Sequence, residues 1–233
     1  MTFGARARIR RSAIRHNLQL IKSKAPGARV MAVIKANAYG HGLLPVAATL
    51  EDVDCLAVAR LEEARKLRNG GIEKSIALLG GAMSMADIEE AALLDIQLGV
   101  HDEQQIRWLE EYKGPSPTVW LKIDTGMNRL GIHPSKTADA IARLRTCAGD
   151  LHLMTHFSNA ENPDDPMTQD QLSRFLPLID DFDGDVGVAN SAGLLGWGDA
   201  LAPLEEFRRQ GRMWIRPGLA LYGISPFPGR FGA

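Results

Sequence analysis

Residues 30–42, VMAVIKANAYGHG, begin as an apolar, β-branched run and end in a polar turn that contains two glycines. A short apolar run bounded by turn-forming residues is typical of a buried strand in a parallel sheet, so we expect a first strand over residues 30–37. Similar runs recur along the chain, and stretches of helical periodicity separate them. They are CLAVAR (55–60), IALLG (76–80), QLGVH (97–101), TVWLKID (118–124), LHLMTHF (151–157), DVGVAN (185–190) and MWIRPG (213–218).

The number and spacing of these runs predict the fold class. Eight strand–helix units begin about 21 to 34 residues apart in a chain of 233 residues, close to the ~250 residues of a typical TIM barrel. An α/β protein with a closed (β/α)8 barrel is therefore favoured over an open, doubly wound sheet. We expect residues 1–225 to form this barrel and residues 226–233, which are rich in Pro and Gly, to begin a linker.

Capping residues mark the starts of several predicted helices. Ser12 precedes a periodic stretch over residues 12–24, Ser84 precedes one over 84–94, and Asp102 opens one over 102–112. A further helix is expected from Leu61, with the glycines at 70 and 71 as its stop.

Composition and charge exclude several classes of protein. Lys and Arg number 27 against 28 acids, and 45% of residues are hydrophobic, so neither disorder nor a fibrous repeat is favoured. No apolar run reaches the ~18 residues of a membrane span. The first residues, MTFGARARIRR, lack the apolar core of a secretory signal, so none is expected. The two cysteines form no CxxC pair and are expected to be reduced. We expect a soluble, cytoplasmic protein that binds no membrane.

The charge is unevenly distributed along the chain. The first 50 residues hold nine Lys or Arg and no acid. Nucleic-acid binding is one explanation, but the segment lacks interleaved aromatic residues and the whole chain is nearly neutral, so no nucleic-acid partner is expected. A phosphorylated cofactor bound near this segment explains the positive charge better.

Polar residues gather at the ends of the predicted strands, where TIM-barrel active sites lie. They are Lys35, Asn37, Arg60, His101, Lys122, Asp124, His156, Asn190, Ser191 and Arg216. Packing alone does not explain why so many apolar strands end in polar or charged residues. A functional site at these strand ends explains them more simply.

Lys35 is the first candidate nucleophile. If it lies in an apolar strand beside Ile34, burial should lower its pKa toward the neutral amine, which is the form that makes a Schiff base. The alternative is a lysine that extends past the strand end into solvent. A metal site is not expected, because His152 and His156 are four residues apart on a strand, which separates them by roughly 13 Å.

At this point the chain resembles the alanine racemase family. The residues that carry the likeness are KANAYGHG (35–42), VARLEEA (58–64), LKIDTGMNRLG (121–131), THFSNAE (155–161), NSAG (190–193) and RPGLALYG (216–223). They span almost the whole chain in order, and the resemblance implies a pyridoxal-phosphate-binding (β/α)8 barrel.

The resemblance also implies residue roles. Lys35 would carry pyridoxal 5'-phosphate as a Schiff base and act as a base on one face of the substrate Cα, and Arg216 would face the pyridine nitrogen. His156 would lie against the ring. The remaining cofactor-binding residues are Tyr39, Asn190, Ser191, Gly218 and Leu219, of which Tyr39, Ser191, Gly218 and Leu219 would bind the phosphate. Lys122 would be open to carbamylation, and the carbamate would orient Arg129. The catalytic residues that the resemblance implies are Lys35, Arg129, His156 and Arg216.

The implied function is interconversion of L-alanine and D-alanine, which supplies D-alanine for peptidoglycan. Racemisation needs a second acid or base on the opposite face. The family takes it from a tyrosine of a C-terminal β-rich domain that belongs to the partner subunit of a homodimer. None of Tyr39, Tyr112 and Tyr222 matches that tyrosine, so we expect an excised barrel that is weakly active or inactive alone.

Other functions stay open from the sequence. One is a single-domain pyridoxal-phosphate-binding homeostasis protein without racemase activity, and another is an amino-acid decarboxylase that shares the barrel and the lysine. Carbon dioxide release from a basic amino acid would identify the decarboxylase.

Overall fold

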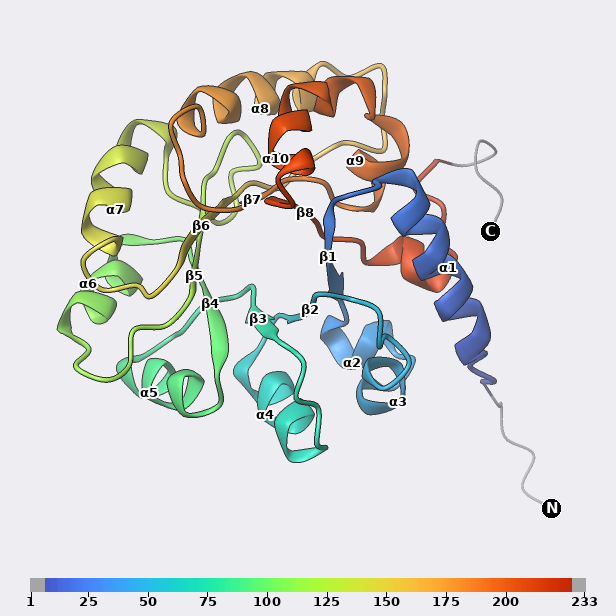
Figure 1. Cartoon of the computed structure of the whole chain (residues 1–233), viewed down its shortest axis with the longest axis horizontal. Coiled ribbons are helices and arrows are strands. Elements are labelled where there is room, and N and C mark those ends of the chain that lie inside the picture. Colours follow the sequence, from blue (N-terminus) through green and yellow to red (C-terminus); the bar gives the residue numbers. More distant parts are fainter. Residues whose placement is uncertain (1–6, 228–233) are drawn as a thin grey trace.

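The computed structural model describes residues 7–227 and shows eight parallel strands that close into a barrel in sequence order. Each strand pairs with its neighbours in the chain, and the last pairs with the first, so the predicted (β/α)8 barrel is confirmed (Figure 1). The strands are β1 (Arg29–Val33), β2 (Cys55–Val58), β3 (Ile76–Leu78), β4 (Ile96–Val100), β5 (Val119–Lys122), β6 (Leu151–Met154), β7 (Val186–Gly187) and β8 (Met213–Ile215).

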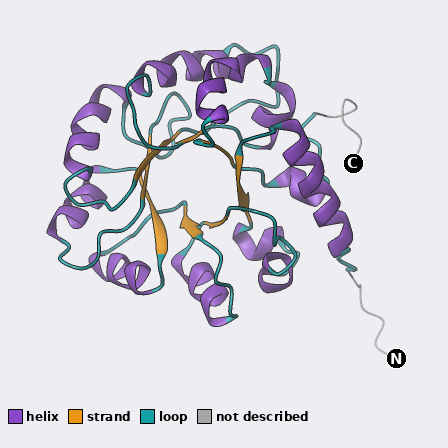
Figure 2. Ribbon diagram, viewed as in Figure 1, coloured by secondary structure: helices purple, strands orange, loops and turns teal. Residues whose placement is uncertain are grey.

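Helices surround the strand ring (Figure 2). The α-helices are α1 (Arg11–Lys24), α2 (Lys35–Tyr39), α3 (Leu43–Ala47), α4 (Leu61–Asn69), α5 (Met85–Leu93), α6 (Glu103–Glu111), α7 (Thr137–Leu144), α8 (Met167–Phe175), α9 (Ser191–Gly196) and α10 (Glu205–Arg209). Four 3-10 helices also lie within residues 7–227, and they are η1 (Pro134–Lys136), η2 (Leu176–Leu178), η3 (Asp199–Leu204) and η4 (Leu219–Tyr222). No helix in this part of the chain is long and apolar enough to cross a lipid bilayer.

The strands alternate their side chains between two apolar layers, as a pleated strand requires. One layer packs under the helices and forms the main core. The other fills the inside of the barrel with eight buried residues, which are Met31, Val33, Cys55, Ala57, Ala77, Trp120, Met154 and Trp214. The barrel is therefore a packed core and leaves room for a site only at its mouth.

Two of the three predicted helix caps are found. The Ser84 hydroxyl accepts a hydrogen bond from the Asp87 amide at 3.2 Å, and the Asp102 carboxylate accepts from the amides of Gln104 and Gln105 at 2.8 and 3.0 Å. The Ser12 cap is wrong, because α1 begins at Arg11 and its N-cap is Arg10, which makes no side-chain cap.

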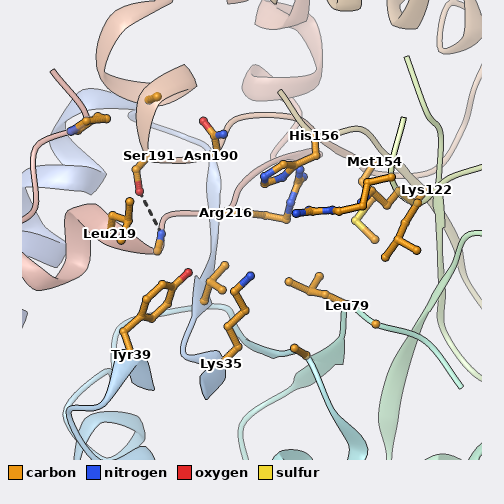
Figure 3. A pocket seen from close by; sticks show the side chains of 18 of the residues that line it. Lys35, Tyr39, Leu79, Lys122, Met154, His156, Asn190, Ser191, Arg216 and Leu219 are labelled. Carbon is orange, nitrogen blue, oxygen red and sulfur yellow. Dashed lines mark hydrogen bonds between the residues drawn. The ribbon is translucent and has the colours of Figure 1, made fainter. Parts of the chain in front are cut away.

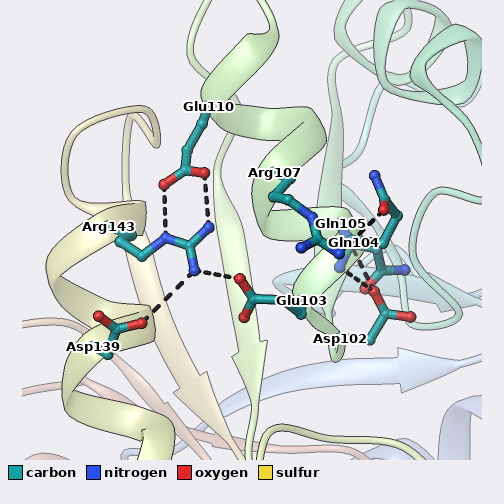
Figure 4. Close-up of polar contacts among 8 residues, drawn as sticks. All are labelled: Asp102, Glu103, Gln104, Gln105, Arg107, Glu110, Asp139 and Arg143. Carbon is teal, nitrogen blue, oxygen red and sulfur yellow. Dashed lines mark hydrogen bonds and ion pairs between the residues drawn. The ribbon is translucent and has the colours of Figure 1, made fainter.

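Ion pairs connect neighbouring helices on the outside of the barrel. Arg143 of α7 makes a two-pronged contact with Glu110 of α6, with both N–O distances at 2.7 Å, and also contacts Glu103 and Asp139 (Figure 4). The group fixes α6 against α7. The proposed linker at 226–233 lies largely outside the described residues, which end at 227.

Candidate active site

A cavity of about 500 Å³ opens at the carboxyl ends of the strands, within the size range of small-molecule sites. Its walls come from the segments that follow most of the strands, so residues far apart in sequence meet there (Figure 3). The described residues that line it are Val33, Lys35, Tyr39, Ala59, Leu79, Gly80, Lys122, Arg129, Leu130, Met154, His156, Glu161, Asn190, Ser191, Ala192, Arg216, Gly218, Leu219 and Pro226.

The segment after β1 departs from the predicted strand. The strand stops at Val33, and the next residues form a left-handed helical turn, with φ of 53°, 55°, 54° and 51° from Ala36 to Tyr39. Lys35 stands at the start of this turn and is half-buried. The prediction that Lys35 lies within the strand is therefore wrong, and so is its full burial among apolar neighbours.

The left-handed turn is strained but well connected. Each non-glycine residue in this conformation costs roughly 1–2 kcal/mol, because Cβ crowds the following carbonyl oxygen. Hydrogen bonds from the Ala38 amide to the Ile34 carbonyl at 2.8 Å and from the Gly42 amide to the Asn37 carbonyl at 3.0 Å close the turn. Lys35 and Tyr39 enter the cavity from this turn, next to each other (Figure 3). Such strain is typical of functional sites.

One end of the cavity collects groups that suit an anion. The Ser191 hydroxyl accepts hydrogen bonds from the backbone amides of Gly218 and Ala220 at 3.1 and 3.2 Å. A Cβ atom on Gly218 would lie 2.6 Å from the Tyr39 hydroxyl, so only glycine allows that hydroxyl to approach. Burial raises the pKa of Tyr39, which keeps its phenol a hydrogen-bond donor.

Arg216 crosses the floor of the cavity. Its side chain is buried, with 4% of the residue exposed, and Nη2 donates to the carbonyls of Thr155 and Val188. The second terminal nitrogen, Nη1, is buried and has no hydrogen-bond partner among the described residues. Burial lowers the pKa of Arg216 to about 10, so the guanidinium stays charged at neutral pH.

Burial and positive neighbours lower the pKa of two other side chains. Burial, with the charges of Arg129 and Arg216, lowers the pKa of Lys122 to about 8. Burial, with the charges of Arg216 and Lys122, lowers the pKa of His156 well below its usual 6.5, so the imidazole is neutral at pH 7. Glu161 is the only acid among the described residues that line the cavity. The site is therefore suited to anionic ligands.

Comparison with known proteins decides the family. A family model described as alanine racemase, N-terminal domain, matches residues 9–226.

This chain belongs to the alanine racemase family.

Curated alanine racemases of Aeromonas hydrophila and Shewanella sediminis are 44% and 45% identical to it over 231 residues. Each match covers 97% of this chain but 62% of the relative, so the chain spans about three-fifths of the length of these relatives. Among solved structures, the biosynthetic alanine racemase of Pseudomonas aeruginosa matches with a TM-score of 0.84 and 38% identity, and it covers 95% of this chain and 60% of that one. The alanine racemase of Oenococcus oeni matches with a TM-score of 0.84 and 29% identity, covering 96% of this chain and 65% of that one.

The alanine racemase motifs converge on the one cavity. Every residue predicted for the site lines it, namely Lys35, Tyr39, Lys122, Arg129, His156, Asn190, Ser191, Arg216, Gly218 and Leu219. Asn190 also caps α9, because its Oδ1 accepts the Gly193 amide at 2.8 Å. Arg129 is the most exposed of the charged residues in this set.

Four polar residues at strand ends do not belong to the cavity wall. Asn37 accepts the Leu43 amide through its side chain at 2.9 Å. Arg60 is the N-cap residue of α4, His101 lies 2.9 Å from the Gly80 carbonyl through Nε2, and Asp124 accepts the amides of Gly126 and Asn128 at 3.0 Å. Among residues 7–227 no group of three or more His, Cys, Asp or Glu could hold a metal ion.

The structure adds wall residues that the sequence did not single out. Glu161, Leu79 and Met154 line the cavity. Glu161 lies inside a motif shared with the alanine racemases, but an acidic residue in a loop gives no signal of its own. Leu79 and Met154 read as core residues in the sequence, because strand ends and cavity walls use the same apolar side chains.

Proposed function

We propose that this chain is the pyridoxal-phosphate-binding barrel of an alanine racemase, which interconverts L-alanine and D-alanine. The observation that carries the proposal is a single cavity that brings together the Lys35 amine, the anion-binding end at Tyr39, Ser191 and Gly218, and the buried Arg216. Each of these features matches a different part of one cofactor. No observation favours a homeostasis protein over a racemase.

The residues present fit pyridoxal phosphate. The orphaned Nη1 of Arg216 needs an acceptor inside the cavity, and the pyridine nitrogen of the cofactor is such an acceptor. The hydroxyls of Tyr39 and Ser191 are donors for a phosphate, and the Gly218 amide, which donates to Ser191 Oγ in this structure, lies beside them. Lys35 would hold the cofactor, Leu219 would offer its backbone amide to the phosphate, and Asn190 and His156 would line the remaining surface.

When bound, the cofactor supplies an electron sink that acidifies the substrate Cα–H. Arg216 would moderate this effect. A guanidinium that keeps its proton can only donate toward the ring nitrogen, so that nitrogen carries no proton of its own. The ring then withdraws electrons less strongly, which favours return of a proton at Cα over loss of the amino or carboxyl group.

Lys35 would take up and return the proton at Cα on one face of the substrate. His156 would pack against the ring as a neutral imidazole, because its lowered pKa leaves it uncharged at pH 7. The positive charges of Arg129 and Arg216 would attract the substrate carboxylate to the cavity.

Carbamylation of Lys122 is part of the proposal. A lysine with a pKa of about 8 carries an appreciable fraction of neutral amine near neutral pH, and that amine can attack carbon dioxide, form an N–C bond and release a proton. The product is an anion beside Arg129 and Arg216 and would orient Arg129. Mass spectrometry of the intact chain in bicarbonate should show the added carboxyl group, whereas an unmodified Lys122 would contradict this part.

The second proton donor is proposed to come from outside this chain. Tyr39 is the only tyrosine among the described residues of the cavity wall, and it faces the anion-binding end. We propose that this donor is a tyrosine of a partner subunit in a homodimer, and that the complete enzyme acts in the cytoplasm to supply D-alanine for peptidoglycan.

Exchange of the alanine Cα proton tests the proposal. The cofactor-loaded chain in D₂O should incorporate deuterium at Cα, slowly alone and faster when the remaining domain of a relative is added. The Lys35→Ala variant should incorporate none. A cofactor-loaded chain that exchanges no proton even with that domain would contradict racemisation.

A further inference from the structure

The left-handed turn at Ala36–Tyr39 is held from outside by a side chain that does not line the cavity. Glu63 lies in the first turn of α4, beyond the second strand of the barrel. Its Oε1 accepts the backbone amide of Asn37, the second residue of the left-handed turn, at 3.2 Å. Glu63 is absent from the described cavity wall, so it contacts the turn and not a ligand.

The other carboxylate oxygen of Glu63 holds the neighbouring loop. Oε2 accepts the amides of Ala59 and Arg60 at 3.1 and 3.3 Å. The contact with Arg60 is the reciprocal bond of a helix N-terminus, and it would exist without the turn after β1. The contact with Asn37 is different, because it joins α4 to the turn after β1, 26 residues earlier in the chain.

Backbone hydrogen bonds close the turn internally, and side chains tie it to the neighbouring elements. The Asn37 side chain accepts the Leu43 amide at 2.9 Å, which ties the turn to the start of α3. Asn37 is therefore held at its amide by Glu63 and uses its side chain to hold α3. Since Ala36, Asn37 and Tyr39 all have positive φ without being glycine, the turn opposes its own backbone preference and needs such anchors.

The turn fixes the positions of Lys35 and Tyr39 relative to each other. Lys35 precedes it and Tyr39 is its last residue, and both point into the cavity from the same edge (Figure 3). If the turn relaxed toward ordinary backbone angles, the Lys35 amine and the Tyr39 hydroxyl would change position relative to each other and to Gly218.

We infer that Glu63 is a positioning residue, whose carboxylate keeps the left-handed turn in place so that Lys35 and Tyr39 engage the cofactor together. The inference rests on the proposed function, because it names the cofactor as the ligand. Glu63 moves no proton and touches no reacting atom. Its loss should therefore weaken cofactor binding before it affects any chemistry.

Two ligands separate the contribution of Lys35 from that of the ring and phosphate contacts. Pyridoxal phosphate can react with Lys35, whereas pyridoxine phosphate has no aldehyde and reports only the ring and phosphate contacts. In Glu63→Ala, Kd for pyridoxal phosphate should rise about tenfold or more and Kd for pyridoxine phosphate by a smaller factor. Glu63→Gln keeps the shape and one acceptor oxygen, and should lie between Glu63→Ala and the unsubstituted chain. Glu62→Ala removes an exposed acid from the same helical turn and should leave both constants within twofold.

Rescue and amide exchange distinguish positioning from general loss of structure. Ala36→Gly, added to Glu63→Ala, relieves the positive φ at position 36 and should recover a large part of the lost affinity. Amide hydrogen exchange of the cofactor-free chain should be faster at Asn37 and Leu43 in Glu63→Ala, with the strands unchanged.

Unchanged affinity in Glu63→Ala, no recovery by Ala36→Gly, or unchanged exchange at Asn37 and Leu43 would each overturn the inference. Failure of the unsubstituted chain to bind either ligand would instead overturn the proposed function. In that case exchange at Asn37 and Leu43 still decides whether Glu63 holds the turn.

Discussion

Lys122 is the lysine that the barrel removes from water. It ends β5, only 8% of the residue is exposed, and Arg129 and Arg216 lie close enough to lower its pKa to about 8. No ion pair within 4.0 Å joins it to Asp124 or to another acid among residues 7–227. A buried cation without an ion pair costs stability, so Lys122 should make the free energy of unfolding depend on pH.

The direction in which stability changes with pH follows from the pKa values of Lys122 in the folded and unfolded chain. Below about pH 8 the amine is charged in both states and the full cost of burial is present. Between about 8 and its unfolded value of 10.5 the unfolded chain binds more protons, so stability rises with pH by up to about 3 kcal/mol. Urea unfolding from pH 7.5 to 10 in buffers free of carbon dioxide should show this rise. Lys122→Met should lack it, and equal pH dependence in both proteins would contradict the assigned burial.

The contrast between Lys35 and Lys122 marks a limit of prediction from sequence. Both lysines follow apolar residues, and the sequence predicted Lys35 to be buried in its strand. Burial was decided by where each strand ends. β1 stops at Val33 and turns left-handed, whereas β5 continues to Lys122. Four successive positive φ angles at residues that are not glycine have no local sequence signal.

At the scale of single helices, caps show which local patterns are reliable. Asp102 precedes α6 and accepts two free amides at the helix start, and Ser84 does the same for α5 with one amide. Ser12 has the same kind of side chain, but α1 starts one residue before it, so its hydroxyl is not at the N-cap position. Residue type therefore predicted the caps only where the helix boundary was also right.

A matched pair of alanine variants checks this distinction. Asp102→Ala should lower the free energy of unfolding by about 1 kcal/mol, because two amides at the start of α6 lose their acceptor. Ser12→Ala should change it by less than about 0.5 kcal/mol. Chemical denaturation of both variants measures the difference, and equal losses would show that the caps are wrongly placed.

At the scale of the whole molecule, the barrel is closed by packing inside it. Trp120 and Trp214 meet edge to face with ring centroids 5.5 Å apart. The Trp214 indole N–H donates to Asp185 at 2.7 Å, and that of Trp120 donates to Gln97 at 2.7 Å. Strand number and order were predictable because the runs repeat at regular spacing. The strand lengths were not, because the ends of strands depend on the loops that form the site.

Removing one of these rings should destabilise the entire barrel. Trp214→Ala deletes a side chain with only 6% of the residue exposed, and should cost about 3–5 kcal/mol of unfolding free energy. Trp214→Phe keeps most of the packing but not the hydrogen bond to Asp185, so its cost should be smaller. Equilibrium urea unfolding compares them, and a cost below about 1 kcal/mol for Trp214→Ala would contradict the closed interior.

The central claim is that Lys35 holds pyridoxal phosphate in the cavity at the barrel mouth. The most direct measurement is borohydride reduction of the chain with pyridoxal phosphate, followed by peptide mapping by mass spectrometry, with Lys35→Arg as the matched control. We predict a pyridoxyl group on Lys35 and none at an equivalent level on Lys122 or on the control. A label on Lys122 or on any other lysine in place of Lys35, or no label at all, would contradict it.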